Sequence, residues 1–528
     1  MSRLPLSRLT ESRRFQLAAA ISSAAASLTP SLLPKTVLVQ GIVAGLAATA
    51  GYAVGALLQW VLTPLWQRLR PTVRDRVSMA LLVVAALWLA PAAWFGHMWQ
   101  RELAASVGET DPPSTYAVVA LLLAGVVVTA AVLAARGLRA AVRWVAGSVF
   151  RALPRWLALA LSILAVTMLT TAVADQVVRN RVLASVDESF RLVNEETEAE
   201  LPRPADALRS GGPGSAASWS TLGHAGREFV SLPPPPGGRQ PIRVYAGIDS
   251  ATSLRARADL VVAELERTGA LRRGVVCVVV PTGTGWVDPA AVKALEALWA
   301  GDSAVASMQY SYLPSVLSLA IDRLRVDAAA EALVGAVVRR WLALPPASRP
   351  RLVLYGESLG ARGVEVALRT VPRATEVVTG VLLAGPPNSN PTWSRLVSHR
   401  DPGTPLLAPT VDGGRSVRFW PGPEMPPRYN PTGDPWLPPS SGPRTLYLQH
   451  PSDPIVWWSP SLLWSEPAWV DDRTTVSRAP PLRWRPLVTF WQVTGDLAFS
   501  NEVPPGHGHR YGPELAAAWA AVAPRPTG

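Results

Sequence analysis

The chain has 528 residues and a formal net charge of +12 at pH 7. This length exceeds what one hydrophobic core usually supports, so we expect two regions. The positive charge does not indicate nucleic-acid binding, because the arginines lie between apolar stretches and no run combines basic residues with stacking aromatics. The single cysteine, Cys277, excludes an intrachain disulfide. Its apolar, strand-like surroundings at 274–280 predict a packed core thiol rather than a nucleophile.

Apolar stretches of membrane-spanning length fill the first third of the chain. They cover residues 15–33, 37–61, 79–97, 116–135 and 156–175. Each approaches the roughly 20 helical residues that cross a hydrocarbon core of ~30 Å. The first is diluted by serines and by Pro30, so it could also be an interfacial segment. Because none carries a charged side chain near its middle, the stretches predict an anchor in a lipid bilayer rather than an ion or proton path.

The arginines between these stretches predict an orientation. They cluster before the first stretch, after the second and after the fourth, at Arg3, Arg8, Arg13, Arg14, Arg68, Arg70, Arg74, Arg76, Arg136, Arg139, Arg143, Arg151 and Arg155. Cations in short loops are retained on the cytoplasmic side of a membrane. Five spans beginning inside would place everything after about residue 175 on the extracytoplasmic side of the cytoplasmic (plasma) membrane.

The remainder of the chain reads as a linker followed by a folded domain. Residues 176–217 are expected to form a juxtamembrane segment and a Pro/Gly/Ser-rich linker, and residues 218–528 a second domain. From about 241 onward, short apolar runs alternate with helical patterns, which indicates a doubly wound α/β domain with a mostly parallel sheet. We expect strands at 241–246, 275–280, 305–310, 351–355, 377–384 and 445–449, with helices near 252–268, 288–299, 324–343, 360–370 and 513–522.

Segments rich in Pro and Trp follow residue 385. Loops of this length inside a domain are usually functional or disordered, and their aromatic content argues against disorder. We interpret them as cap segments over an active site, with irregular core packing as the alternative.

The strand at 351–355 runs into Gly356-Glu357-Ser358-Leu359-Gly360, and a helix follows. A GxSxG pentapeptide alone is weak evidence, but the strand–turn–helix setting is the one that a nucleophile elbow requires. Side chains at Gly356 or Gly360 would collide with neighbouring backbone in so tight a turn. The motif predicts Ser358 as a nucleophile at the carboxyl end of the sheet.

A serine hydroxyl needs an imidazole base, and that base needs a carboxylate to orient it. Asp453 follows the expected strand at 445–449 and is the candidate acid, in the chain order Ser–Asp–His that this fold uses. Two candidates for the base lie before the last helix, in Gly506-His507-Gly508-His509. We favour His507 and keep His509 as the alternative, while His450, beside the acid, reads as a structural or rim residue.

Two backbone amides should stabilise the oxyanion. Leu359 offers one, and Gly283 or Thr284, in the glycine-containing loop after the strand at 275–280, offers the other. The loop lacks the Gly-Lys-Ser/Thr ending of a phosphate-binding P-loop. No spacing of His, Asp, Glu or Cys forms a metal-ligand set, so we expect neither a metal nor another cofactor.

The chain resembles an actinobacterial membrane-bound α/β-hydrolase family, whose members join a multi-span amino-terminal domain to a hydrolase domain. The motifs that carry the resemblance are Pro241–Gly247, Pro281–Pro289, Gln309–Ser315, Gly356–Gly360 and Gly506–His509. They are spread over most of residues 241–511, whereas the spans match in layout only. The resemblance implies a serine hydrolase whose substrate is poorly defined, and it does not choose between His507 and His509.

These observations predict an esterase- or lipase-like enzyme acting through an acyl-enzyme on lipid or other acyl esters of the cell envelope. An acyltransferase using the same three residues is the near alternative. A noncatalytic membrane scaffold with a hydrolase fold is the alternative from another class. The sequence specifies neither the acyl chain nor the oligomeric state.

Overall fold

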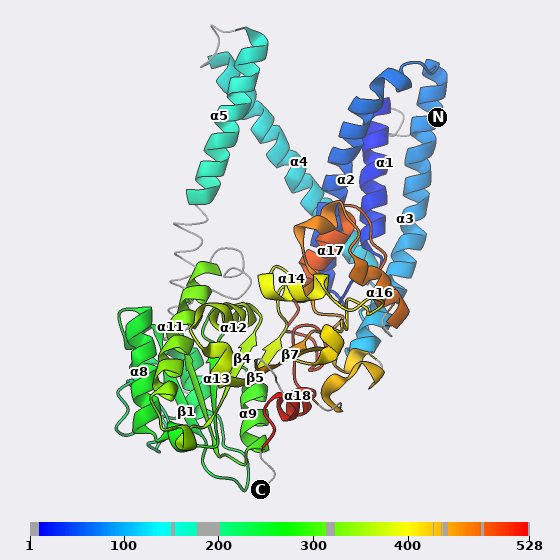
Figure 1. Cartoon of the computed structure of the whole chain (residues 1–528). Coiled ribbons are helices and arrows are strands. Elements are labelled where there is room, and N and C mark those ends of the chain that lie inside the picture. Colours follow the sequence, from blue (N-terminus) through cyan, green and yellow to red (C-terminus); the bar gives the residue numbers. More distant parts are fainter. Residues whose placement is uncertain are drawn as a thin grey trace. The chain divides into compact units, whose positions relative to one another are not determined.

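The computed structural model describes residues 10–148, 154–176, 201–312, 323–425, 427–433, 436, 442–476 and 480–525. The chain divides into two compact units (Figure 1). The helical unit comprises Met1–Leu183, Ser459–Thr474 and Arg478–Phe499, and the sheet unit comprises Ala184–Trp458, Thr475–Ser477 and Ser500–Gly528. The predicted juxtamembrane residues 177–200 lie outside the described ones.

A helix occupies each of the five predicted apolar stretches. The helices are α1 (Glu11–Ser27), α2 (Val37–Trp66), α3 (Pro71–Val107), α4 (Tyr116–Ser148) and α5 (Arg155–Gln176). Among the described residues, α2, α3 and α4 are long and apolar enough to cross a membrane. Helix α1 has 17 residues, and its serines dilute its apolar content. By length and composition, three of the described helices could therefore cross a membrane, and the count of five spans remains a prediction.

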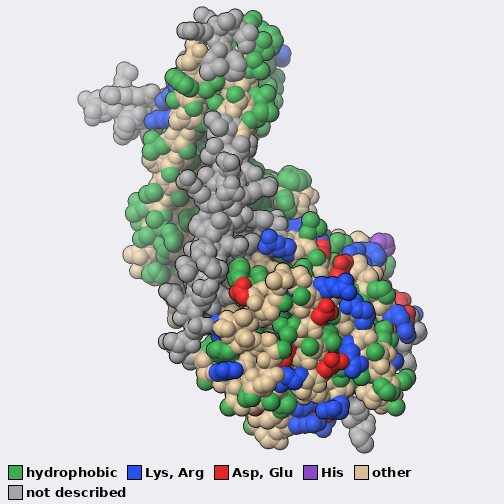
Figure 2. All heavy atoms as spheres, turned by 90° about the vertical axis from the view of Figure 1, so that its left-hand side faces the viewer, with side chains coloured by type: hydrophobic (Ala, Val, Ile, Leu, Met, Phe, Trp, Pro, Cys, Tyr) green, Lys and Arg blue, Asp and Glu red, His purple; other side chains and the backbone are tan. Residues whose placement is uncertain are grey.

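Glycines on one helix let its neighbours approach closely, as small residues do in membrane helix bundles. A Cβ atom added to Gly41 or Gly45 of α2 would lie 2.5 Å from a side-chain atom of α4. A Cβ atom at Gly51 would lie 2.2 Å from Ser23 Oγ of α1. Helices α1 and α4 therefore both pack closely against the backbone of α2. On the face seen in Figure 2, hydrophobic side chains cover the helices, and charged side chains gather on the sheet unit.

A late segment of the chain packs within the helical unit. It contains the 3₁₀ helix η12 (Pro460–Leu463), α16 (Ala468–Val476) and α17 (Val488–Leu497). Gln492 Nε2 of α17 donates to the carbonyls of Ser27 and Thr29, at 3.2 and 2.8 Å. Lys35 and Asp496 form an ion pair of 2.7 Å, with side chains 1% and 0% exposed. The expected continuous domain over 218–528 is therefore interrupted: residues 459–474 and 478–499, part of the predicted cap, fold with the helices before residue 183.

The sheet unit is built on seven parallel strands in the order β1-β3-β2-β4-β5-β7-β6. The strands are β1 (Ile242–Ala246), β2 (Val275–Val280), β3 (Ser303–Met308), β4 (Arg351–Glu357), β5 (Val378–Ala384), β6 (Val417–Trp420) and β7 (Arg444–Leu448). Their near-continuous burial is typical of a parallel sheet covered on both faces. The prediction of a doubly wound α/β domain is confirmed.

Helices cover both faces of this sheet. Helices α8 (Leu254–Arg267), α11 (Arg323–Leu342) and α12 (Leu359–Thr370) form one layer, and α9 (Pro289–Leu298) and α18 (Leu515–Val522) pack together on the other (Figure 1). The shorter α13 (Ala374–Val377) and α14 (Pro391–Ser398) follow α12 and β5 along the chain. The crossover helices bring the carboxyl ends of all the strands to one edge, where the loops that carry the candidate residues begin.

Three features of the sheet unit differ from expectation. Strand β3 begins at Ser303, two residues before the predicted start, because Ser303 pairs with Val275 of β2; its polar side chain is fully buried, which the apolar pattern does not reveal. Strand β6, within the Pro/Trp-rich region, was not predicted. Part of the expected linker pairs with the sheet edge instead, since Ser210 N donates to Arg243 O at 3.0 Å.

Candidate active site

Ser358 occupies a sharp turn between β4 and α12. Its backbone has φ 54° and ψ −121°, in the left-handed half of φ space, which is strained for a residue with a side chain. A Cβ atom on Gly356 would lie 2.5 Å from Gly360 O, and one on Gly360 would lie 2.1 Å from Val280 O. The steric reason expected for both glycines is confirmed. The turn places Ser358 at the carboxyl end of the sheet, with 3% of its surface exposed.

Asp453 lies on the loop after β7 and is completely buried. Its Oδ1 accepts from the backbone N–H of Ile455 at 2.9 Å and so caps the short helix α15 (Pro454–Trp457). Its Oδ2 lies 2.7 Å from His509 Nδ1 and accepts from Tyr511 Oη at 2.8 Å. These contacts fix the carboxylate and give it the geometry of an acid that orients an imidazole.

Gly385 brings this Asp–His pair next to the serine turn. A Cβ atom on Gly385, whose φ is +55°, would lie 2.2 Å from His509 Cε1 and 2.9 Å from Asp453 Oδ2. The preceding residue, Ala384, accepts a 2.9 Å hydrogen bond from Ser358 N. Ser358 and His509 therefore contact adjacent residues at the end of β5. Glycine is required at position 385 because any side chain there would displace the imidazole.

His509 has one ring nitrogen available for chemistry. Its Nε2 is buried and has no hydrogen-bond partner among the described residues, and the nearest carboxyl oxygen, Glu357 Oε1, lies 4.0 Å away. Burial alone would lower the pKa of His509, but the charge and hydrogen bond of Asp453 outweigh it and raise the pKa above its ordinary value. The imidazole is thus a stronger base than a free histidine.

The preference for His507 over His509 does not agree with the geometry. His507 Nδ1 lies 3.0 Å from Glu424 Oε1, and the side chain is 24% exposed. Glu424 also accepts from Ser452 N at 2.9 Å, and Ser452 Oγ accepts from Gly508 N at 2.7 Å. His507 therefore belongs to a network that ties together the loops carrying the acid and the base, while the contact with Asp453 is made by His509.

His450 supports the same two loops. It is fully buried, its Nδ1 lies 2.9 Å from Gly508 O, and its Nε2 lies 2.9 Å from Glu514 Oε1. Burial opposes the charged form, but the carboxylate of Glu514 prevails and raises the pKa of His450 to about 9. The ring also stacks on Tyr511, with centroids 4.2 Å apart. His450 is a structural residue rather than a rim residue.

One expected oxyanion donor, Leu359, directly follows Ser358, and the others, Gly283 and Thr284, lie in the loop after β2. Leu359 is the first residue of α12, so its amide has no acceptor within the helix. The loop after β2 is close to the serine turn, because a Cβ atom on Gly360 would meet Val280 O and Pro281 O. No hydrogen bond within the described residues uses the amides of Gly283 or Thr284. These amides remain free to serve as oxyanion donors.

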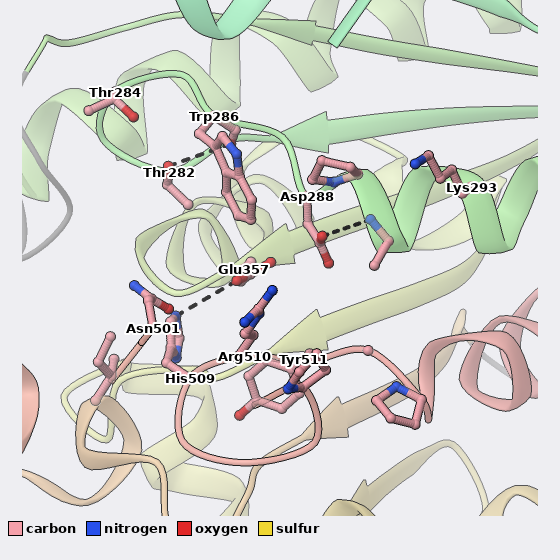
Figure 3. Close-up of a pocket in the computed structure, with 16 residues that line it drawn as sticks. Thr282, Thr284, Trp286, Asp288, Lys293, Glu357, Asn501, His509, Arg510 and Tyr511 are labelled. Atoms are coloured by element: carbon pink, nitrogen blue, oxygen red, sulfur yellow. Dashed lines mark hydrogen bonds and ion pairs between the residues drawn. The ribbon is translucent and has the colours of Figure 1, made fainter. Parts of the chain in front are cut away.

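A cavity of about 880 Å³ opens beside His509 (Figure 3). Its lining includes Thr282, Thr284, Trp286, Asp288, Lys293, Glu357, Ile455, Asn501, Arg510 and Tyr511. Burial, together with the charge of Asp288, raises the pKa of Glu357 to about 8. Burial likewise raises the pKa of Asp288 to about 6. The volume of the cavity lies within the usual range of small-molecule sites in proteins.

Sequence reasoning missed Glu357, Tyr511, Lys293 and Arg510. Glu357 stands inside the GxSxG motif at a position where the motif accepts any residue, and Tyr511 follows His509 by two residues. Closeness along the chain to the candidate nucleophile and base could have drawn attention to both. No local pattern marks Lys293, which reaches the site from the exposed side of α9.

Among the described residues, no three His, Cys, Asp or Glu side chains are grouped closely enough to hold a metal ion. Cys277 is 1% exposed within β2, and burial raises the pKa of its thiol, so it is an unreactive core residue as the sequence predicted.

Comparison with known proteins agrees with this geometry. The profile described as the Alpha/beta-hydrolase family matches residues 242–527, and the one described as the Alpha/beta-hydrolase family N-terminus matches residues 28–234. No curated protein and no solved structure gives a significant match. The carboxyl-terminal match covers more than half of the chain and includes every candidate site residue. The chain belongs to the α/β-hydrolase family.

Proposed function

We propose that the chain is a membrane-anchored serine hydrolase that cleaves carboxylic esters with Ser358, His509 and Asp453. The observation that carries the proposal is the 2.7 Å contact between His509 Nδ1 and Asp453 Oδ2, which leaves the buried Nε2 without a partner among the described residues, beside the Ser358 turn. An imidazole held in this way by a carboxylate is the arrangement that activates a serine hydroxyl.

The proposed reaction has two stages. Ser358 Oγ attacks the carbonyl carbon of the ester and gives its proton to His509 Nε2. The tetrahedral intermediate then expels the alcohol, which takes the proton from His509, and leaves an acyl group on Ser358. Water attacks this acyl-enzyme with His509 again as base, so that a carboxylic acid is released and the serine regains its proton.

Charge develops on the carbonyl oxygen during both stages. We assign its stabilisation to the amides of Leu359 and of Gly283 or Thr284; the loop that carries the latter two begins at Pro281, which approaches Gly360. Amide donors fixed by the fold need no rearrangement at the moment of reaction, and losing one such donor typically costs ~10²–10³ in kcat. Asp453 stabilises the imidazolium that forms on His509.

The proposed substrates are lipid or other acyl esters of the cell envelope. Three helices able to cross a membrane and a cavity of about 880 Å³ support this choice. The arginine pattern supports a catalytic domain on the extracytoplasmic side of the cytoplasmic membrane, after five spans. Where a hydroxyl acceptor replaces water in the second stage, the same residues would perform acyl transfer.

A fluorophosphonate probe tests the nucleophile directly in the detergent-solubilised full-length chain. We expect covalent labelling that is lost in Ser358→Ala and retained in Ser394→Ala, which removes an exposed hydroxyl on α14 of the same unit. Folded protein that takes up no probe would support the noncatalytic scaffold and overturn the proposal. Product analysis with and without a glycerol acceptor separates hydrolysis from acyl transfer.

The proposed orientation can be tested with introduced cysteines, because the native Cys277 is buried and unreactive. In intact cells, a membrane-impermeant maleimide should label Glu331→Cys, on the exposed surface of α11, without permeabilisation. Arg139→Cys, in a loop-proximal part of α4 expected on the cytoplasmic side, should label after permeabilisation. The reverse pattern would overturn the orientation.

A further inference from the structure

The cavity beside His509 carries two cationic side chains with different origins. Lys293 comes from α9, and Arg510 from the loop that holds His509 (Figure 3). Both residues are exposed, and among the described residues neither forms an ion pair. Among the described residues, the side chain of Arg510 makes one long hydrogen bond, from Nη1 to Val503 O at 3.4 Å. Both positive charges are therefore available to a ligand that enters the cavity.

The two carboxyl groups of the cavity, Asp288 and Glu357, form no ion pair with these cations among the described residues. Asp288 is 7% exposed and accepts from the amides of Ala290 and Ala291, at 2.8 and 3.3 Å. Glu357 is 6% exposed, and its Oε2 accepts from Tyr355 Oη at 2.9 Å. The raised pKa of Glu357, about 8, keeps that group largely uncharged at neutral pH. The two acids are buried and hydrogen-bonded within the protein, whereas the two cations are exposed.

The buried Nε2 of His509 is a second, independent sign that a ligand belongs here. It lines the same cavity and has no partner in the described part of the chain. Apolar side chains, including Trp286, Ile455 and Pro505, complete the lining. The cavity thus combines the free nitrogen of His509, an apolar surface and two cations that form no ion pair among the described residues. Such a lining favours a molecule with an apolar part and an anionic group.

We infer that Lys293 and Arg510 form a subsite for a phosphate or carboxylate group carried by the ester substrate. Arg510 offers a planar fork that suits paired oxygens, and Lys293 adds a point charge. The inference rests on the hydrolase activity proposed above and specifies its substrate class: anionic esters, either phosphate-bearing lipids or soluble acyl esters with a free acid.

Paired chromogenic esters test this preference. For the full-length chain in neutral detergent, kcat/KM is compared for p-nitrophenyl hemisuccinate, which is anionic, and p-nitrophenyl butyrate, which is neutral. We expect Lys293→Ala and Arg510→Ala each to lower the anionic-to-neutral ratio about tenfold or more, as loss of a charge-assisted hydrogen bond does. Lys293→Arg should keep the ratio, and Arg369→Ala, an exposed charge on α12, serves as the matched control. An unchanged ratio in both alanine variants would overturn the inference.

A chemical test that does not depend on catalysis uses the scarcity of lysine. Lys293 is the only lysine besides the buried Lys35, so its acetylation by sulfosuccinimidyl acetate, read by peptide mass spectrometry, reports occupancy of the cavity. In Ser358→Ala protein, we expect dihexanoyl phosphatidic acid to slow acetylation and neutral dihexanoylglycerol to leave it unchanged.

Glycerol 3-phosphate distinguishes the two sources of the anion. Protection by it as well as by the lipid indicates recognition of a soluble phosphate group, and protection by the lipid alone indicates a lipid headgroup. Equal protection by the neutral lipid, or none by either phosphate, would contradict the subsite. Because this readout needs no turnover, an inactive enzyme that still shows anion protection would refute the hydrolase proposal and leave the subsite standing.

Discussion

Replacing each of the two histidines of the Gly-His-Gly-His loop by alanine, one at a time, gives the sharpest test of the site. His509 bonds Asp453 at 2.7 Å and is 3% exposed, whereas His507 bonds Glu424 at 3.0 Å and its side chain is 24% exposed. Only the first of these contacts supplies a base for Ser358. His509→Ala should therefore remove the chemistry, and His507→Ala should loosen the loop.

The expected magnitudes differ by several orders. Removing the base of a serine–histidine pair lowers kcat by at least ~10⁴, which corresponds to ~5.5 kcal/mol of transition-state stabilisation. His507→Ala removes one partly exposed hydrogen bond, worth ~1 kcal/mol, so the loss of kcat should stay below about tenfold. The gap between the variants should exceed ~10³.

Initial rates of p-nitrophenyl butyrate hydrolysis, normalised to folded protein by size-exclusion chromatography in detergent, measure both losses. Near-ultraviolet circular dichroism shows whether either variant has lost its packing. If His507→Ala abolishes turnover while His509→Ala keeps most of it, the base has been assigned to the wrong residue. Equal, small losses of rate in both variants would refute the proposed triad.

Three further changes have defined outcomes. Gly360→Ala places a Cβ atom 2.1 Å from Val280 O, so chemical denaturation in detergent should show a loss of at least ~1–3 kcal/mol, and wild-type stability would contradict the tight turn. In the folded state the pKa of Glu357 is about 8, against an ordinary value of 4.5. The bound proton therefore contributes fully to the free energy of unfolding below about pH 4.5, and this contribution is lost as the pH rises through 8. Glu357→Gln should flatten the fall of Tm with pH over that window, and an unaltered slope would reject the assignment. Lys35→Met leaves the Asp496 carboxylate buried without its ion-pair partner and should lower the free energy of unfolding by ~3–5 kcal/mol. Adding Asp496→Asn should restore most of this stability, and no recovery in the double variant would count against the ion pair.

The sequence predicted those parts of the site whose cause is local. The tight turn at Ser358 requires glycine at positions 356 and 360 for steric reasons, and both glycines are visible in one short motif. The parallel sheet follows from buried apolar runs that alternate with helices. Asp453 could be proposed because it follows a recognisable strand.

Other parts depend on distances between separate loops. His507 and His509 are indistinguishable in the sequence, and the choice between them depends on where Glu424 and Gly385 lie in space. The partnership of Lys35 with Asp496 joins positions near opposite ends of the chain, so no local pattern contains it. Strand β6 has four residues in a Pro/Trp-rich stretch, which is too short for periodicity to reveal.

The late segment that packs in the helical unit also constrains the order of biosynthesis. A chain is made from its amino terminus, so α1 and α2 exist long before α17, which holds Asp496 and Gln492. Until nearly the whole chain has left the ribosome, Lys35 has no carboxylate partner from α17, and the carbonyl of Thr29 lacks the amide donor that Gln492 provides. The helical unit is completed by one of the last helices to be synthesised. A ribosome that stops before residue 488 therefore leaves the helical unit without α17 and without the contacts that α17 makes to Lys35 and Thr29.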